Sequence, residues 1–473
     1  MNKNSLLFAA SEVYPFAKSG GLADVAHSLP RALSSEYTVD VVMPLYSSID
    51  RKKFKITSLK EKFEIYLAET SHTVELFGCK YEGINYIFVY SSLLCDREFL
   101  YGTPHNAYED NALRFGLFNY AILELLKKKS YDVVHLNDWQ TALSALLIKE
   151  DASIKTKVLF TIHNLAYQGV FDRFRLNELG LSESYFNIDS LEFYEQISFM
   201  KAGIAYADVI TTVSPTYAKE ILTPVFGCGL DGFLRLHENK LYGIMNGIDT
   251  EHFSPQTDKL LKKPYKDLVG KRANKNAYLK EVGLDDLSKP LFIFVGRFTW
   301  QKGLDLLANV LEEFATQECN IAIIGDGEEN YQYRLKEIAD RHANIHLEFT
   351  YNEALSHRMY GAADFLLMPS LFEPCGLNQF IAMSYGALPI VHSVGGLADS
   401  VHNYREFDAK SQQAYGISFT HATEQSLSHA TQEALELYKS KKDYNKIIKH
   451  NMLCDFSFEA GAKLYSTLYE KTI

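Results

Sequence analysis

Short apolar runs rich in β-branched residues recur along the whole chain, and stretches with helical spacing separate them. The runs are apolar on both faces and end at Gly, Pro or polar residues, which is typical of strands buried in parallel sheets. Strands that alternate with helices predict βαβ units and doubly wound α/β domains. The expected strands cover residues 6–10, 39–44, 84–90, 133–136, 158–163 and 209–213, and then 291–296, 321–325, 345–349, 365–369, 389–392 and 417–419.

The 473-residue length indicates at least two domains. Segment 254–290 is rich in Lys and Asp and poor in large apolar residues, so it reads as a surface connection with one helix over 268–282. We place the hinge just before it, which gives domains 1–244 and 245–455. The final segment, 456–473, has apolar and aromatic residues at helical spacing, and we expect it to pack back on the first domain.

Charge and cysteine usage exclude several classes of protein. The formal net charge of -11 argues against a nucleic-acid partner, because such proteins usually carry a basic patch. The six cysteines show no CxxC pairs, so neither zinc spacing nor a disulfide framework is predicted, and a reducing cytoplasm fits. The apolar run at 5–10 is far shorter than the ~20 residues of a membrane span. We therefore expect a cytoplasmic protein with no membrane partner.

A double-glycine turn follows the first expected strand. In Lys18-Ser19-Gly20-Gly21, the glycines let backbone N–H groups approach an anion, and Lys18 adds a charge. The alternative is a tight strand–helix turn with a solvated lysine. The sequence Gly-Gly-Leu-Ala-Asp of this turn recurs at residues 395–399, which suggests the same loop chemistry in both halves.

Two cations follow the strand expected at 291–296. Arg297 and Lys302 lie where parallel sheets bind ligands, at the carboxyl end of a strand. A planar guanidinium and a point-charge ammonium together suit a diphosphate. Two solvated surface cations are the alternative, and it is slightly favoured when the pair is considered alone.

Glu373 follows the strand expected at 365–369, in Phe-Glu-Pro-Cys-Gly-Leu. Pro374 and Gly376 suggest a helix start whose free N–H groups could hold a phosphate. The carboxylate could then bond sugar hydroxyls. Equally, Glu373 could be an acid in the first helical turn, favoured by the helix dipole.

Three further positions carry two interpretations each. His163 ends an expected strand and could bond a sugar hydroxyl, although a structural histidine is the commoner case. Asp138 could face a ligand, but an N-cap is the more ordinary role, and Trp139 beside it could stack on a sugar or pack in the core. Tyr351 follows a strand and could stack on a base, or it could be one of many core tyrosines. Ser214-Pro215 predicts the start of a helix.

Taken in chain order, these segments resemble one family, the bacterial glycogen synthases and plant starch synthases. The most specific matches are KSGGLADV at 18–25, GRFTWQKG at 296–303 and FEPCGL at 372–377, and the resemblance spans nearly the whole chain. It implies an α/β protein of the GT-B fold, with two doubly wound Rossmann-like domains facing a central cleft.

The resemblance also implies a role for each position. Arg297 and Lys302 look like the pair that grips the donor diphosphate, and Glu373 like the carboxylate that holds the donor sugar. His163 looks like the histidine that contacts the transferred glucose. The other positions implied in sugar or donor binding are Asp138, Lys18, Gly20, Gly21, Asn246, Tyr351, Cys375, Gly376 and Leu377. Asn137 departs from the family, which commonly has His there.

The implied activity is glycogen synthesis: transfer of glucose from ADP-glucose to the non-reducing end of an α-1,4-glucan, with retention of configuration. The resemblance implies no metal and no cofactor, and a leaving phosphate that helps to deprotonate the acceptor. Two alternatives remain at this point. One is a different GT-B enzyme that acts on a small acceptor or epimerises a nucleotide-sugar, and the other is a glucan-binding protein without catalytic activity.

Overall fold

The chain forms two compact units in the computed structural model, which describes residues 3–103, 106–284, 286–350 and 352–473. Unit 1 comprises Met1–Asn246 together with Phe458–Ile473, and unit 2 comprises Gly247–Ser457. Unit 2 is thus an insertion near the end of unit 1. The boundary placed at 244–245 from the sequence lies two residues before this division at 246–247.

Unit 1 is built on a nine-stranded sheet in the order β12-β11-β7-β6-β1-β2-β5-β4-β3. All neighbours from β12 to β5 are parallel, and the strand order reverses between β1 and β6. The predicted doubly wound arrangement is confirmed here. The strands are β1 (Ser5–Ala9), β2 (Thr38–Pro44), β3 (Thr57–Leu67), β4 (Thr70–Tyr81), β5 (Ile84–Tyr90), β6 (Val133–Asn137), β7 (Lys157–Ile162), β11 (Val209–Thr212) and β12 (Leu241–Gly243).

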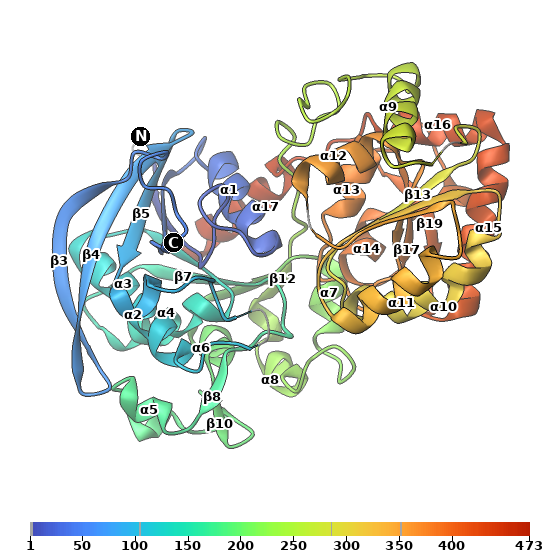
Figure 1. Cartoon of the computed structure of the whole chain (residues 1–473). Helices are drawn as coiled ribbons and strands as arrows, with labels where there is room; N and C mark the ends of the chain where they lie inside the picture. The colour runs from blue at the N-terminus through green and yellow to red at the C-terminus, as the bar shows by residue number, and fades with distance from the viewer. Residues whose placement is uncertain (1–2, 104–105, 285, 351) are drawn as a thin grey trace. The chain divides into compact units, whose positions relative to one another are not determined.

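An antiparallel hairpin, β3–β4, extends the edge of this sheet as a long curved ribbon (Figure 1). This hairpin was not among the strands predicted from the sequence. The first half of β3 is exposed and includes Lys60, Glu61 and Lys62, so the alternation that marks a half-buried strand is confined to residues 63–67. The connecting residues, Ala68 and Glu69, both have positive φ, a conformation that usually calls for Asn or Gly.

Unit 1 also holds a small antiparallel sheet in the order β8-β10-β9, formed by Val170–Asp172, Gln196–Ser198 and Glu192–Phe193. Its helices are α1 (Gly21–Leu33), α2 (Ser92–Cys95), α3 (Asn111–Lys128), α4 (Trp139–Glu150), α5 (Arg175–Glu178), α6 (Phe199–Tyr206), α7 (Pro215–Glu220), α8 (Asp231–Leu236) and α17 (Glu459–Thr472). The predicted start at Ser214-Pro215 is confirmed, because Ser214 Oγ accepts the Tyr217 amide at 2.8 Å.

The last helix, α17, belongs to the core of unit 1. It packs beside α1, and Tyr465, Leu468 and Tyr469 are buried there. The Tyr469 hydroxyl is hydrogen-bonded to Nδ1 of His135 on β6 at 2.7 Å. The other ring nitrogen of His135 continues this buried chain of hydrogen bonds to Thr161. A residue near the end of the chain therefore completes the polar interior of the first sheet.

Unit 2 has a seven-stranded sheet in the order β15-β14-β13-β16-β17-β19-β18, and all neighbouring pairs are parallel. The order reverses between β13 and β16, and helices lie on both faces (Figure 1). The strands are β13 (Leu291–Val295), β14 (Asn320–Ile324), β15 (Ile345–Glu348), β16 (Phe365–Met368), β17 (Leu388–His392), β18 (His402–Asn403) and β19 (Tyr415–Phe419).

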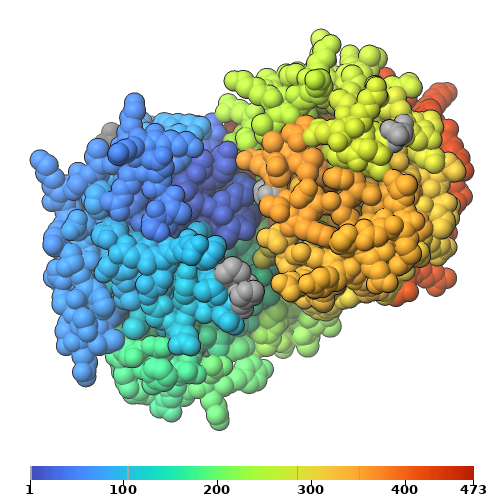
Figure 2. All heavy atoms as spheres, viewed as in Figure 1, coloured from blue at the N-terminus to red at the C-terminus, as the bar shows by residue number. Residues whose placement is uncertain are grey.

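The helices of unit 2 are α9 (Leu268–Glu281), α10 (Leu304–Ala315), α11 (Glu329–Ala339), α12 (Glu353–Ala362), α13 (Asn378–Ser384), α14 (Gly395–Ser400), α15 (Glu424–Lys439) and α16 (Lys441–Asn451). Helix α9 corresponds to the one expected in the connecting segment, and it packs on α12. The yellow-green atoms of this segment lie on the outside of unit 2 (Figure 2).

Candidate active site

In unit 2 the chemistry-bearing residues gather where β13 and β16 end. These neighbouring strands flank the reversal of strand order, the position at which open α/β sheets bind ligands. Strand β13 leads into the loop with Arg297 and Lys302, and β16 leads into the loop with Glu373. The sheet therefore brings together two loops that are about seventy residues apart in the chain.

Lys302 and Glu373 form an ion pair with 2.6 Å between Nζ and Oε2. The Glu373 side chain is nearly buried, at 7% exposure, whereas Lys302 is 21% exposed. Lys302 ends a short 3-10 turn, and Gly303 follows it with φ +71°. A Cβ on Gly303 would lie 2.0 Å from the Pro369 carbonyl oxygen, so a glycine allows the two loops to approach.

Glu373 is held in the loop before α13. Oε2 also accepts a hydrogen bond from the Ser370 hydroxyl at 2.9 Å, and the Glu373 carbonyl accepts the Gly396 amide. Oε1 receives no hydrogen bond from the part of the chain that the structure describes, so it can meet a ligand hydroxyl. The alternative of a first-turn helix acid is wrong, because α13 begins only at Asn378.

The other positions expected around the donor are Arg297 and the loop of residues 375–377. Arg297 is exposed directly after β13. Gly376 adopts φ +73°, a conformation that suits glycine, between Cys375 and Leu377. A Cβ on Gly396 would lie 2.2 Å from the Cys375 carbonyl, so the second double-glycine turn packs directly against this loop. Tyr351 lies outside the described residues.

In unit 1, Asp138 follows β6 at the other reversal of strand order and has an unusual backbone, with φ +57° and ψ −179°. It occupies the N-cap position of α4 but makes no capping hydrogen bond, so the N-cap interpretation of its carboxylate is wrong. Instead Oδ1 accepts the His163 amide at 2.8 Å. Burial raises the pKa of Asp138 to about 7, against the hydrogen bonds from the His163 and Asn164 amides.

His163 lies next to Asn137, and the geometry fixes its tautomer. Nδ2 of Asn137 donates to the carbonyls of Ala9 at 3.0 Å and His135 at 3.3 Å, which turns Oδ1 toward His163. That oxygen lies 2.9 Å from Nε2 of His163 and can only accept, so Nε2 carries the proton. Burial lowers the pKa of His163 to about 3, and the ring is therefore neutral with a lone pair on Nδ1.

The double-glycine turn of unit 1 lies against a buried carboxylate, Glu12, which was not among the predicted site residues. Lys18 pairs with Asp24 at 2.7 Å, and the Ser19 amide donates to Glu12 at 2.5 Å. A Cβ on Gly20 would lie 3.5 Å from Oε1 of Glu12. Burial raises the pKa of Glu12. Its place between β1 and the KSGGLADV segment was the available signal, but a single glutamate there forms no motif of its own.

Trp139 and Asn246, two positions considered for sugar binding, are both buried. Trp139 packs edge-to-face against Phe115 at 4.9 Å and Phe171 at 5.7 Å, which supports the core interpretation. Asn246 is buried and is the last residue of the first segment of unit 1.

Within the described ranges, no helix is both long and apolar enough to cross a membrane.

Comparison with known proteins places the chain among glucan synthases. A family profile described as starch synthase catalytic domain matches residues 5–236, and one described as glycosyl transferases group 1 matches residues 278–451. A glycogen synthase from Geotalea daltonii is 40% identical over 476 residues, with 98% of each chain covered. The chain belongs to the glycogen and starch synthase family. A glycogen synthase from Syntrophotalea carbinolica is 38% identical, with 99% of each chain covered.

A solved member of the family has the same fold. The catalytic domain of starch synthase IV from Arabidopsis thaliana, bound to ADP and acarbose, matches with a TM-score of 0.93 and 32% identity, covering 100% of this chain and 99% of that one. Sucrose-phosphate synthase from Thermosynechococcus elongatus matches with a TM-score of 0.64 at 17% identity, covering 99% of each chain, which shows a shared fold alone. The GT-B expectation is confirmed.

Proposed function

We propose that this chain is a glycogen synthase that transfers glucose from ADP-glucose to the non-reducing end of an α-1,4-glucan, with retention of configuration. The Lys302–Glu373 pair carries this proposal, since it lies at the ligand-binding edge of unit 2 in a chain of this family. The names of the relatives support a glucan product, and the plant starch synthase bound to ADP supports an adenine nucleotide.

In this proposal Lys302 and Glu373 bind different parts of the donor, the diphosphate and the glucose. The Lys302 ammonium has three N–H groups, and Glu373 uses one of them, so others can reach the diphosphate together with exposed Arg297. Oε1 of Glu373 can accept from a hydroxyl of the donor glucose. Its partner Lys302 and the Ser370 hydroxyl hold the carboxylate in place, which orients the sugar before reaction.

The reaction balances without a redox step. The bond between the anomeric carbon and the phosphate oxygen breaks, the acceptor 4-oxygen bonds to that carbon, and its proton leaves with ADP or solvent. Negative charge grows on the departing phosphate, and preorganised cations stabilise it most in the transition state. Attack from the face that the phosphate leaves retains the α configuration, and Arg297 and Lys302 supply the positive charge.

Unit 1 contributes groups that suit the sugar rather than the phosphate. His163 is neutral and presents a lone pair at Nδ1, which accepts from a hydroxyl. Burial raises the pKa of Asp138 to about 7, which lets its carboxyl group share a proton with a sugar hydroxyl. We assign both to the transferred glucose, with Lys18 and the Gly20-Gly21 turn at the donor. We propose that this step uses no metal and no cofactor. We also propose a cytoplasmic location.

The deciding experiment measures ADP or UDP release from the two nucleotide-sugars with glycogen as acceptor. We expect ADP-glucose to give the higher kcat/KM, and NMR of the product to show that the newly added glucose units are joined by α-1,4 linkages only. Excess chelator should leave the rate unchanged. Nucleotide release without glycogen elongation, or elongation with UDP-glucose at an equal or higher kcat/KM, would contradict the proposal as stated.

A further inference from the structure

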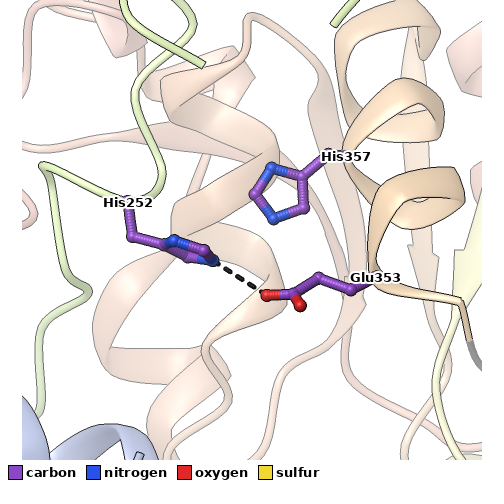
Figure 3. A group of neighbouring side chains, drawn as sticks. All are labelled: His252, Glu353 and His357. Atoms are coloured by element: carbon purple, nitrogen blue, oxygen red, sulfur yellow. Dashed lines mark hydrogen bonds and ion pairs between the residues drawn. The ribbon is translucent and has the colours of Figure 1, made fainter. Parts of the chain in front are cut away.

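Three potential metal ligands meet at the start of helix α12 in unit 2. His252, Glu353 and His357 each offer one ligand atom, and these atoms all lie within 4.8 Å of one another. Glu353 and His357 are four residues apart on α12, so they share one helix face. His252 approaches from a separate segment, and its Nε2 lies 3.0 Å from Oε1 of Glu353 (Figure 3).

The local fold orients each imidazole. The amides of His252 and Glu251 donate to Oδ1 of Asp249, which holds the turn that presents the His252 ring. The His357 ring stacks on Phe253 with centroids 5.0 Å apart and an interplanar angle of 22°. The two histidine rings lie 5.0 Å apart, edge to face. Phe253 thus gives the cluster an apolar wall.

Asp258 determines which nitrogen of His357 faces the cluster. Its Oδ2 lies 2.8 Å from Nδ1 of His357 and also accepts from the Tyr385 hydroxyl, while Oδ1 accepts the Leu260 amide. A carboxylate with these three donors acts as the acceptor, so Nδ1 carries the proton. Nε2 then has the lone pair, and Figure 3 shows it pointing toward Glu353 and His252.

Nε2 of His357 is buried and has no hydrogen-bond partner in the described part of the chain. A buried polar atom left without a partner costs free energy, and such atoms often mark a bound group. The arrangement of carboxylate, imidazole and open lone pair is the one that metal-binding histidines adopt, with the distant nitrogen hydrogen-bonded to a carboxylate. A cation at the centre would satisfy this lone pair.

We propose that His252, Glu353 and His357 bind one zinc-type transition-metal ion, with water in the fourth position. Two imidazoles and one carboxylate suit zinc, whereas magnesium and calcium prefer oxygen ligands alone. Tetrahedral zinc at its usual bond lengths separates ligand atoms by about 3.4 Å. The side chains of His252 and Glu353 are 28% and 47% exposed, so they can close the remaining distance.

None of the three proposed ligands is assigned a role in glucosyl transfer, and the ion serves a different purpose. It joins the turn at 249–253 to α12, two segments that are far apart in the sequence, and so a bound ion stabilises unit 2 by linkage. The sequence did not reveal it, because His252 and Glu353 are 101 positions apart. The only sequence signal is a Glu and a His at helical spacing.

The test titrates zinc into the chelator-treated full chain by calorimetry and repeats the titration with cobalt, whose visible absorption reports coordination. We expect one equivalent to bind and the melting temperature to rise. His252→Ala and Glu353→Gln change partly exposed side chains, and each should weaken zinc binding by at least about 100-fold. Asp258→Asn should weaken it by about 10–100-fold, because it loosens the orientation of His357.

His342→Ala is the matched control. His342 also bonds a glutamate, with Nε2 2.9 Å from Oε1 of Glu312, and no third zinc ligand joins that pair among the described residues. This variant should bind zinc like the parent. The proposal is overturned if the parent binds no zinc, if His252→Ala binds it equally well, or if His342→Ala loses the same equivalent.

Discussion

Asp138 keeps a backbone conformation that few residues other than glycine adopt. With φ +57° and ψ −179°, it lies in a region whose occupation costs about 1–3 kcal/mol for a residue with a Cβ. The surrounding structure holds it there, with the carboxylate on the His163 amide. Strain of this kind persists most often where function requires a side chain at one position, which agrees with a sugar-binding role for Asp138.

We therefore expect Asp138→Gly to be more stable than Asp138→Ala, because glycine relieves the strain that alanine keeps. Both variants lose the carboxylate, so both should lose most glucosyl transfer. After the larger unfolded-state entropy of glycine is included, the difference in unfolding free energy should be about 1 kcal/mol or more. Urea denaturation of the two variants measures it, and equal stabilities would show that the backbone is not strained.

The neutral state of His163 gives a prediction for pH dependence. Its pKa of about 3 lies below the ordinary value of ~6.5, so the folded protein leaves the ring unprotonated throughout pH 5–8. The rate should therefore show no loss at acid pH that is due to this residue. In Asn137→Asp the new carboxylate favours the charged form of the His163 ring, so the pKa of His163 rises. Protonation of His163 should then reduce the rate as the pH falls.

Ring ¹⁵N NMR of both proteins, together with their pH–rate profiles, checks this prediction. The parent should show a proton on Nε2 and none on Nδ1 across this range. A structural role for Asn137 alone would lower the stability of the variant without adding an acid limb to the rate profile. A parent ring that titrates near pH 6.5 would contradict the assignment.

At the scale of elements, the loops after β13 and β16 are joined by Lys302 and Glu373. Lys302→Ala leaves a nearly buried carboxylate without its cation, which should destabilise unit 2 by about 1–3 kcal/mol. It should also lower kcat by on the order of 10²-fold, because the positive charge that stabilises the departing phosphate is lost. Combining it with Glu373→Gln should recover stability but not kcat. A double-mutant cycle in urea gives the coupling, and a coupling near zero would contradict the pairing.

The packing of α17 on unit 1 can be tested at a single hydroxyl. Tyr469→Phe removes the partner of His135 Nδ1 and leaves a buried nitrogen without a hydrogen bond, at a cost of about 1–3 kcal/mol. Tyr37→Phe is a useful comparison, because its hydroxyl makes one longer hydrogen bond of 3.3 Å to the Ser466 carbonyl. Thermal unfolding should show the larger loss for Tyr469→Phe, and the reverse order would argue against the His135 hydrogen-bond chain.

The elements that the sequence predicted well are those with both faces buried. Every expected strand appears within two residues of its predicted bounds, because apolar runs of this kind have few other stable locations. The β3–β4 hairpin was missed because the first half of β3 is exposed and charged, and because the Ala68-Glu69 turn has none of the usual turn residues. Within the site, residue types were predictable but contacts were not. Lys302 and Glu373 are 71 positions apart, and only the strand order makes them neighbours.

For the whole molecule, ADP affinity and turnover should depend on different residues. Arg297 and Lys302, the cations assigned to the diphosphate, lie in unit 2, and His163 lies in unit 1. His163→Ala should therefore leave the affinity for ADP within a few-fold of the parent, while glucosyl transfer falls by on the order of 10²-fold. Calorimetry with ADP on the full-length variant makes the comparison. Loss of ADP binding in His163→Ala would contradict this division.

The return of the chain to unit 1 has a consequence for biosynthesis. A ribosome makes α17 after the whole of unit 2, so unit 2 has all of its residues before unit 1 has its last helix. Until then, the surface that contacts Tyr465 and Tyr469 is uncovered in the nascent protein, and His135 lacks its hydrogen bond to the Tyr469 hydroxyl. Domains usually fold from the N-terminus as they emerge. Here the order of completion is inverted, and the first unit to be translated is the last to close.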